Sequence, residues 1–335
     1  MLKSACNFSD GTTDQDSEEN QDYLCGTDVS LQWLLQILLD KFNHELTEEP
    51  QWIVERLNRP KWDEPATSTV LRVTFGWEEE HMPRSVIVKT PASKDIRDDE
   101  VAKYHYVMFK RECNIYDWTK NHRSLPSPAI YHIKRHAKDY NNVVVMEDAS
   151  ERGVQQDANK GLSVDAVRDL LRRLATLHTV SMKVNGWTTM VSDLPNSYYS
   201  SLVSNFNEMM NFFEHQDVDH SRFVETAKYF SSDYLKLTST EAAALFPPKV
   251  FVHGEPYASN VFLLNDTDDK VGCVIDWTGG HAGCYGEDIA KAICWNLSMK
   301  VTATKNKADI EPMIERAKGL IQNAYTMSKL DEESI

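Results

Sequence analysis

The 335-residue sequence contains no long apolar run. No stretch reaches the roughly 18 apolar residues that a membrane-spanning helix requires. The N-terminal segment MLKSACNFSDGTTDQDSEENQ also lacks the apolar core of a signal peptide. We therefore expect a cytoplasmic location and no membrane partner.

Positive charge is scarce, because 36 Lys and Arg residues face 51 Asp and Glu residues, for a formal net charge of -15. Phosphate contacts with nucleic acids require clustered Lys and Arg, so a nucleic acid is not an expected partner. An acidic protein can still hold a phosphorylated ligand where one lysine or a bound cation supplies a local positive field.

Cysteine pairs with redox or zinc-site spacing are absent. The six cysteines form no C-x-x-C motif and have no zinc-like spacing with histidine, which indicates reduced, structural thiols. They are Cys6, Cys25, Cys113, Cys273, Cys284 and Cys294.

The composition is that of a globular protein, with 41% hydrophobic and 26% charged residues. Residues 1–27 are polar and acidic, so they are expected to form a disordered leader. Residues 28–148 are expected to form an N-terminal nucleotide-binding lobe and residues 149–335 a C-terminal catalytic and substrate lobe.

The first lobe is predicted to contain a helix, a hairpin and a further helix and strand pair. A helix begins after Ser30, strands cover 68–77 and 85–90, a helix covers 98–121, and strands cover 129–135 and 141–148. In the second helix, Val107, Phe109, Cys113 and Tyr116 are expected to share one buried stripe. The second lobe is predicted to be mostly helical, over 163–182, 201–215, 221–237 and 310–330, with strands flanking residues 253–260. The fold class is therefore α+β.

The segment HGEPYASN carries the first candidate chemistry. His253, Glu255 and Asn260 have the same offsets as the kinase catalytic loop H-R-D-x-x-x-x-N. Asp276 ends an apolar run beyond the next strand. All four are candidate catalytic residues, and the oxygens of Asn260 and Asp276 suit a magnesium ion.

A lysine and a glutamate upstream complete the pattern. Lys89 ends the apolar strand VIVK, and Glu112 lies in the helix that follows. Phosphoryl transfer requires positioned groups that neutralise phosphate charge, which a strand lysine fixed by a helix glutamate supplies. Each residue alone has a simpler explanation, because Lys89 could be a surface residue, Glu112 a solvated helix acid, and His253 a core histidine. Their order along the chain favours the kinase-like interpretation.

Six segments together resemble a known superfamily: IVKT, FKRECNIYDW, VVVMEDAS, LATLHTVSM, VHGEPYASNVF and VIDWTGGHAGCYGEDIAK. From about Leu31 onward the chain resembles the aminoglycoside phosphotransferase and choline kinase superfamily, specifically its CHK kinase-like or ecdysteroid-kinase-like domains. The resemblance implies a bilobal protein-kinase-like fold, with a small antiparallel-sheet N-lobe carrying one main helix and a larger helical C-lobe. It also implies ATP and Mg²⁺ as cofactors and a small-molecule alcohol as acceptor.

The resemblance assigns roles to individual residues. It implies a Lys89–Glu112 pair, an adenine-contacting hinge, two magnesium ligands, a catalytic base and a structural aspartate. The hinge is Met146, Glu147 and Asp148, the ligands are Asn260 and Asp276, the base is Glu255, and the structural residue is Asp288. A protein kinase fits less well, because most of the helical part precedes the loop and no A-P-E segment follows Asp276.

Two departures from the family pattern predict reduced activity. Glu255 stands where the family usually has Asp, and displacing a reacting group by about 1 Å can reduce the rate about a hundredfold. The expected phosphate loop contains Asp63, Glu64 and Pro65 but no glycine, so Ser68 and its neighbour Thr67 would have to bind phosphate. The alternative hypothesis is therefore a catalytically weak or inactive kinase-like module that binds a ligand or partner.

The sequence does not identify the acceptor or the oligomeric state. A quaternary ammonium such as choline would require an aromatic cage. Candidate cage residues, which at such spacing are more often core residues, are Trp187, Tyr198, Tyr199, Trp277 and Trp295.

Overall fold

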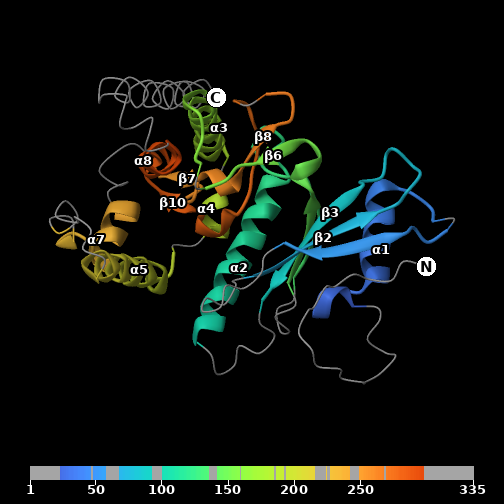
Figure 1. Cartoon of the computed structure of the whole chain (residues 1–335), viewed down its shortest axis with the longest axis horizontal. Coiled ribbons are helices and arrows are strands. Elements are labelled where there is room, and N and C mark those ends of the chain that lie inside the picture. The colour runs from blue at the N-terminus through green and yellow to red at the C-terminus, as the bar shows by residue number, and fades with distance from the viewer. Residues whose placement is uncertain are drawn as a thin grey trace. The chain divides into compact units, whose positions relative to one another are not determined.

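The computed structural model describes residues 23–46, 48–57, 68–92, 100–135, 142–158, 160–184, 186–191, 194–215, 224, 227–241, 249–267 and 269–297. The chain divides into two compact units (Figure 1). The first comprises Met1–Asn121 and Ser127–Arg152, and the second comprises His122–Pro126 and Gly153–Ile335. The main division lies close to the lobe boundary expected after residue 148.

The first unit contains an antiparallel sheet with the strand order β1-β2-β3-β5-β4. The predicted hairpin is present as β2 and β3, and the predicted strand pair as β4 and β5. Strand β1 was not expected, and it pairs along the outer edge of β2. The strands are β1 (Trp52–Arg56), β2 (Ser68–Phe75), β3 (Ser85–Pro91), β4 (Ile130–Lys134) and β5 (Val143–Glu147).

Helix α1 (Leu31–Phe42) packs on one face of this sheet. Ser30 caps the helix as predicted, because its side chain accepts a hydrogen bond from the Trp33 amide at 3.3 Å. Val86 and Val88 of β3 belong to the hydrophobic cluster beneath α1. Alternate residues of a strand point to opposite faces, so Lys89 lies on the other face of the sheet.

Helix α2 (Glu100–Thr119) packs against β3 and β4. The predicted buried stripe is correct for Phe109, Cys113 and Tyr116 but wrong for Val107, which is 45% exposed. Met108 is buried instead. The buried stripe of α2 is therefore rotated about the helix axis relative to the predicted stripe.

The second unit contains two small sheets and several helices. The pairings are β10 with β7, and β6-β8-β9, all antiparallel. The short strands β6 and β10 were not expected. The elements are β6 (Gly153–Gln155), α3 (Val164–Lys183), α4 (Trp187–Met190), α5 (Asn196–His215), α7 (Ser232–Lys236), a π-helical turn (Leu237–Glu241), β7 (Val250–Val252), β8 (Val261–Leu264), β9 (Val271–Val274), β10 (His281–Gly283) and α8 (Tyr285–Asn296).

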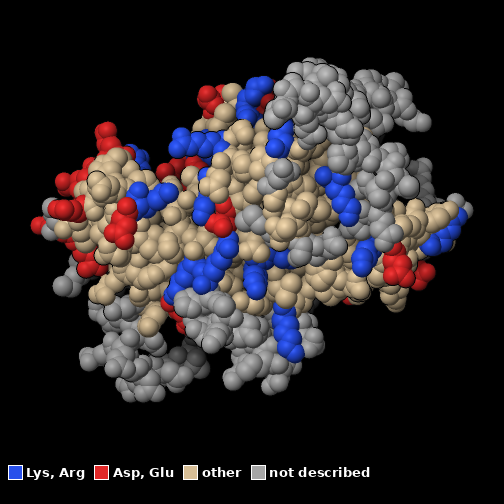
Figure 2. All heavy atoms as spheres, turned by 180° about the vertical axis from the view of Figure 1, so that it is seen from behind, with Lys and Arg blue, Asp and Glu red and all other residues tan. Residues whose placement is uncertain are grey.

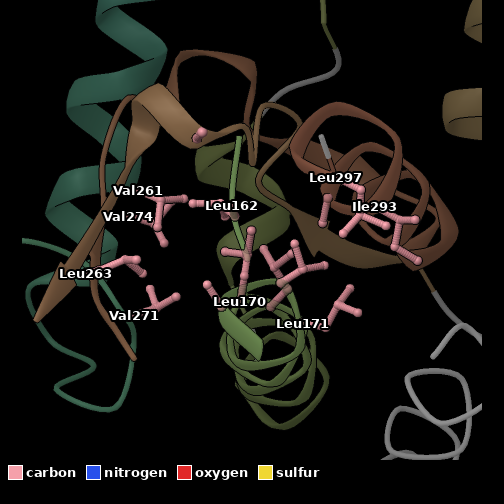
Figure 3. Packing of buried hydrophobic residues seen from close by; sticks show 14 of the residues in the cluster. Leu162, Leu170, Leu171, Val261, Leu263, Val271, Val274, Ile293 and Leu297 are labelled. Carbon is pink, nitrogen blue, oxygen red and sulfur yellow. The ribbon is translucent and has the colours of Figure 1, made fainter. Parts of the chain in front are cut away.

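The core of the second unit forms where α3, the β8-β9 hairpin and α8 meet (Figure 3). The four leucines predicted to face inward from α3 are all buried, which confirms the predicted amphipathic helix. They are Leu170, Leu171, Leu174 and Leu177. The β8-β9 hairpin, which directly follows the HGEPYASN segment, is therefore anchored on a closely packed core.

Several expectations lie wholly or partly outside the described residues. These are most of the acidic leader, the helix expected over 310–330, most of 221–230, and the loop containing Asp63, Glu64, Pro65 and Thr67. At the described end of the leader, Leu24 is 1% exposed and packs beside α1, so ordered structure begins before residue 28.

One cysteine differs from the expected reduced state. Cys25 is disulfide-bonded. The other described cysteines, Cys113, Cys273, Cys284 and Cys294, are free thiols.

The surface carries charges of both signs. On the face shown in Figure 2, the described Lys and Arg side chains occur in separate groups, with Asp and Glu interspersed. No helix in the described part of the chain is both long enough and apolar enough to cross a bilayer.

Candidate functional site

A buried ion pair joins the central strand of the first sheet to helix α2. Lys89 Nζ lies 2.7 Å from Glu112 Oε1, and the two side chains are 10% and 1% exposed. The structure thus brings these two predicted residues together. Lys89 sits between Val70 and Val144 on the neighbouring strands, which fixes its position in the middle of the sheet.

Burial of this pair is hard to explain by stability alone. Removing two charges from water carries a desolvation cost that often equals or exceeds their attraction. The surroundings of the pair are poorly accessible to water. Burial and then the Glu112 charge raise the pKa of the neighbouring Cys113 thiol to about 12. A charged pair retained in such a place is consistent with a functional role.

The segment expected to contact adenine lies at the end of β5. Met146 is buried and pairs with Ile87. Glu147 binds Arg152 at 2.5 Å and also accepts a hydrogen bond from the Ala129 amide. Asp148 accepts hydrogen bonds from Arg72 Nε at 2.6 Å and from the Ser85 hydroxyl at 2.8 Å. Both carboxylates are therefore occupied by partners within the first unit.

Asp148 and Ser68 occupy structured positions rather than open loops. Burial alone raises the pKa of Asp148, but the hydrogen bonds from Arg72, Ser150 and Ser85 outweigh it and lower the pKa below its ordinary value. Ser68 begins β2, is 4% exposed and pairs with Pro91. A contact between Ser68 and phosphate stays a prediction.

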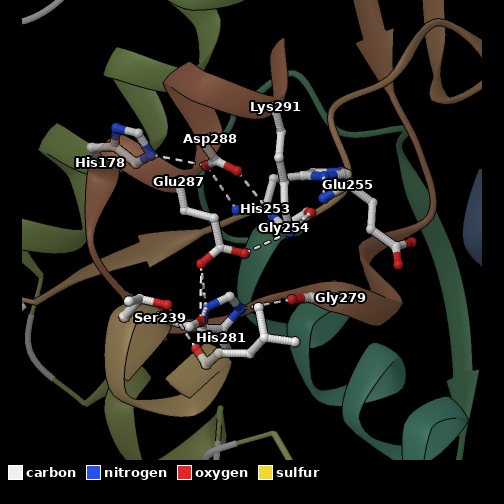
Figure 4. A network of polar contacts seen from close by, with 12 residues as sticks. His178, Ser239, His253, Gly254, Glu255, Gly279, His281, Glu287, Asp288 and Lys291 are labelled. Carbon is white, nitrogen blue, oxygen red and sulfur yellow. Dashed lines mark hydrogen bonds and ion pairs between the residues drawn. The ribbon is translucent and has the colours of Figure 1, made fainter. Parts of the chain in front are cut away.

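In the second unit, the HGEPYASN segment connects β7 to β8 (Figure 4). Gly254 has a φ of +85°, in the left-handed region that favours glycine. A Cβ atom at this position would lie 2.4 Å from the carbonyl oxygen of Gly279. The sharp turn before Glu255 therefore requires glycine.

Asp288 of α8 binds the backbone of this turn. Its carboxylate accepts hydrogen bonds from the amides of His253 and Gly254, both at 2.9 Å, and lies 3.0 Å from His178 Nε2. Burial raises the pKa of Asp288, but the His178 hydrogen bond, the neighbouring His178 and His253 rings and the Gly254 amide lower it below its ordinary value. Asp288 therefore acts as an anionic anchor, the structural role that the resemblance implies.

His253 is a fully buried residue that forms a hydrogen bond with the backbone of this turn. Burial lowers its pKa, although the charges of Asp288 and Asp276 oppose this shift. Its Nδ1 accepts a hydrogen bond from the Glu255 amide at 3.2 Å, which requires the unprotonated nitrogen. This geometry gives His253 a positioning role rather than direct contact with a reacting group.

The Glu255 side chain lies between Tyr257 and Gly279. The Tyr257 hydroxyl is 3.4 Å from Glu255 Oε2. A Cβ atom at position 279 would lie 2.9 Å from Glu255 Cγ, so glycine there makes room for the longer acid. The absence of a side chain at Gly279 therefore leaves space for the glutamate side chain at position 255.

Asn260 and Asp276 lie at adjacent ends of the β8-β9 hairpin. The Asn260 side-chain amide donates to the Glu255 carbonyl at 3.0 Å, and the Asn260 carbonyl accepts from the Ile275 amide at 2.9 Å. Asp276 has a φ of +60°, and its carboxylate accepts a hydrogen bond from the Thr278 hydroxyl at 2.6 Å.

Tyr257 links these groups. Burial and then the negative charges of Glu255 and Asp276 raise the pKa of the Tyr257 hydroxyl, while a hydrogen bond with the Asn260 side chain opposes the increase. The Tyr257 hydroxyl thus lies near Glu255 and the Asn260 side chain, and the charge of Asp276 also acts on it.

The sequence prediction missed Tyr257, Gly279 and His178 as members of this site. Tyr257 lies inside the quoted motif, so its position was a usable signal. Gly279 and His178 are separated from the motif along the chain, and only tertiary packing brings them to it.

Comparison with known proteins identifies the family. The model of the ecdysteroid kinase-like family matches residues 64–308, which is most of the chain. The chain belongs to the ecdysteroid kinase-like family. This match confirms the resemblance found in the sequence. No curated protein matches the chain significantly.

Solved structures that resemble this chain include a phosphotransferase and a choline kinase. A putative aminoglycoside phosphotransferase from Ralstonia eutropha is 14% identical, with a TM-score of 0.49 and coverage of 85% of this chain and 80% of the other. A choline kinase from Cryptosporidium parvum is 9% identical, with a TM-score of 0.45 and coverage of 90% and 95%.

Proposed function

We propose that this ecdysteroid kinase-like protein is an ATP- and Mg²⁺-dependent phosphotransferase that acts on a hydroxyl of a small molecule. The observation that carries the proposal is the turn that holds Asn260 beside Glu255. The Asn260 side chain donates to the Glu255 carbonyl, and the Asn260 carbonyl accepts from the Ile275 amide, next to Asp276. Asp288 anchors this turn. The buried Lys89–Glu112 pair supports it independently, because kinases use such a pair to bind nucleotide phosphates.

Each group suits one task in phosphoryl transfer. Glu255 would accept the proton of the acceptor hydroxyl as it attacks the terminal phosphorus of ATP, and Lys89 would offset phosphate charge. Asn260 and Asp276 would bind Mg²⁺. Bound magnesium neutralises phosphate charge and orients the transferred group.

The donor set of this chain fits magnesium. The Asn260 side-chain nitrogen donates to the Glu255 carbonyl, so the side-chain oxygen is the atom that would bind a metal. Asp276 adds a carboxylate. Magnesium binds through one or two such protein oxygens together with substrate phosphates and water, so a larger cluster of acids is not required. Among the described residues, no group of three or more His, Cys, Asp or Glu side chains is suited to a metal.

At the end of β5, adenine would form hydrogen bonds with main-chain atoms rather than with carboxylates. The side chains of Glu147 and Asp148 are engaged by Arg152 and Arg72, so the adenine contact proposed for Met146 to Asp148 would use main-chain atoms. Main-chain donors and acceptors suit a neutral base edge.

The acceptor would be an alcohol other than one bound in an aromatic cage. Four of the five candidate cage residues, Trp187, Tyr198, Tyr199 and Trp277, are buried core residues. Trp295 is 48% exposed, but Lys291 Nζ lies 5.3 Å from its ring centroid. The chain's own cation thus occupies the place a quaternary ammonium would take.

A cytoplasmic location stays a prediction. The disulfide at Cys25 weighs against it, because disulfides are uncommon in reducing compartments.

Nucleotide binding and turnover test the proposal directly. With ATP and Mg²⁺ at about ten times the dissociation constant, we expect the melting temperature to rise by about 2–4 °C, because ligands that bind only the folded state stabilise it. A metabolite-library screen for ATP consumption should then yield an acceptor, and mass spectrometry should detect its phosphorylated form. If millimolar ATP with Mg²⁺ produces no shift, the binding-module alternative gains and the kinase proposal fails.

Variants of Glu255 measure how much this carboxylate contributes to kcat as a general base. Because Gly279 makes room for the longer acid and Tyr257 lies at its carboxylate, we expect Glu255→Asp to lower kcat rather than raise it. Glu255→Gln should lower kcat by about 10²–10⁴-fold, the usual contribution of a general base. A large gain in Glu255→Asp would instead show that glutamate is a weakened base, as the sequence alone suggested.

A further inference from the structure

Both polar atoms of the Gly254 backbone are bound by helix α8. Asp288 accepts from the Gly254 amide at 2.9 Å, and Lys291 Nζ donates to the Gly254 carbonyl oxygen at 2.7 Å (Figure 4). These atoms belong to two different peptide groups, the one before Gly254 and the one after it. Lys291 therefore controls a peptide group that Asp288 does not touch.

The peptide group controlled by Lys291 is the one that leads into Glu255. Its carbonyl oxygen binds Lys291, and its N–H donates to His253 Nδ1 at 3.2 Å. A peptide group is planar, so contacts at both edges fix its orientation. That plane determines the direction in which the Glu255 side chain leaves the backbone. Glycine at 254 supplies little resistance of its own to rotation of this plane.

A chain of partners fixes the position of the Lys291 ammonium. Glu287 Oε1 lies 2.6 Å from Lys291 Nζ, one helical turn earlier on α8. The other Glu287 oxygen accepts from the Ser239 hydroxyl at 2.9 Å and lies 3.1 Å from His281 Nε2. The Lys291 and Glu287 side chains are only 21% and 16% exposed, and that of His281 is fully buried. Limited access to water strengthens these charge-assisted contacts.

This network also reaches the residue beside the acid. His281 Nδ1 lies 2.8 Å from the Gly279 carbonyl oxygen, and Gly279 packs against the Glu255 side chain. The same network of contacts therefore holds the Gly254–Glu255 peptide group and the Gly279 backbone that packs against the Glu255 side chain. A simple helix-surface ion pair would contact neither of them.

We propose that Lys291, oriented by Glu287, is a positioning residue that aims Glu255. Lys291 does not contact substrate in this role and acts only through the Gly254–Glu255 peptide group. The inference rests on the proposed function for its kinetic consequence, while its structural consequence can be measured without turnover.

Replacement of Lys291 tests the inference by kinetics. Lys291→Met keeps the length and apolar stem of the side chain and removes the ammonium. We expect kcat for ATP-dependent turnover to fall about 10–100-fold, as a displacement of the acid by about 1 Å would cause, with KM for ATP within about twofold. Lys291→Arg, which retains a donor for the carbonyl and a partner for Glu287, should recover most of the loss.

The matched control is Arg168→Met. It removes one positive charge from an exposed ion pair with Asp165 on α3, where no contact with the turn exists among the described residues. We expect its kcat to equal that of the wild type. If the control loses as much activity as Lys291→Met, net charge rather than positioning explains the effect, and the inference is overturned.

A double substitution separates positioning from general stability. Because Lys291 acts through Glu255, Lys291→Met should cause no further loss of kcat in a protein that already carries Glu255→Gln. Full additivity of the two losses would overturn the inference. Should Lys291→Met not fold, Glu287→Gln is expected to give a smaller loss with the same non-additivity.

Hydrogen exchange provides the test that needs no activity. In Lys291→Met the Glu255 amide should exchange about tenfold faster, while amides of β8 and β9 retain their wild-type rates. An unchanged Glu255 amide contradicts the inference even in an active enzyme. A wild-type protein that transfers no phosphoryl group contradicts the proposed function, and the exchange result then decides the positioning role separately.

Discussion

Asp276→Asn is expected to abolish phosphoryl transfer and ATP hydrolysis while the protein stays folded. The substitution removes the one negative charge that Asp276 would offer to magnesium, and metal stabilisation of transition-state charge is worth several kcal/mol. The loss in kcat should therefore be about a thousandfold or more. Steady-state ATPase assays across a magnesium titration measure it.

Asparagine is the informative replacement because of the backbone at this position. Asp276 has a φ of +60°, a conformation that Asn and Asp tolerate better than other residues with side chains. The Thr278 hydroxyl can also still donate to the side-chain oxygen of asparagine. Asp276→Ala would remove the charge and add backbone strain, so its effects would be harder to separate.

The control for this experiment lies in the same hairpin. Asp266 is an exposed residue of the turn between β8 and β9, and Asp266→Asn removes the same charge away from the site. It should leave kcat unchanged. Retention of a third or more of wild-type activity by Asp276→Asn would rule out its assignment as a magnesium ligand.

The second large effect is expected for Asp288→Asn, which should lower both stability and kcat. The buried carboxylate accepts from two backbone amides and lies at hydrogen-bond distance from His178, and an amide cannot accept from all of them. Removing one member of such a buried charged network costs roughly 3–5 kcal/mol. We expect the urea midpoint to fall accordingly and kcat at low temperature to fall about a hundredfold, because the turn before Glu255 loses its anchor.

The stability difference should depend on pH in a defined direction. The pKa of Asp288 is lowered from its ordinary value of 3.8, so the unfolded chain binds protons more readily than the folded one. The stabilisation by Asp288 is then complete above pH 4 and is lost as the pH falls through the lower folded-state value. The difference in unfolding free energy between wild type and Asp288→Asn should be constant near pH 7 and shrink below about pH 4.

Asp169→Asn is the matched control for this substitution. Asp169 is a buried acid of α3 that accepts a hydrogen bond from the Val271 amide at 2.9 Å, which is similar chemistry at a place remote from Glu255 along the chain. It should lower stability and leave kcat within about threefold. If both variants lower kcat equally, Asp288 stabilises the unit generally and does not specifically orient the turn.

Local sequence patterns predicted the longer elements of this fold. Helix α1, helix α3 and the β2-β3 hairpin have long periodic runs and recognisable caps, so their structure follows from short-range information. Strands β6 and β10 are three residues each, and their pairing with β8 and β7 depends on contacts far along the chain. A three-residue run is too short for its periodicity to be read.

The candidate site was predictable to the extent that its residues lie in one motif or in a fixed chain order. The Lys89–Glu112 pair could be proposed because a strand lysine preceded a helix acid, and the structure places the two side chains 2.7 Å apart. The contact of Lys291 with the turn, and those of Glu287 with Lys291 and His281, could not be proposed, since they depend on how the elements of the second unit pack. The rotation of the α2 stripe that exposes Val107 has the same tertiary origin.

The contact between Gly279 and Glu255 constrains how this site could have changed. A Cβ atom at 279 would lie 2.9 Å from Glu255 Cγ, and aspartate has the same Cγ atom. Exchange between glutamate and aspartate at position 255 therefore leaves the constraint on position 279 unchanged, and either acid favours glycine there.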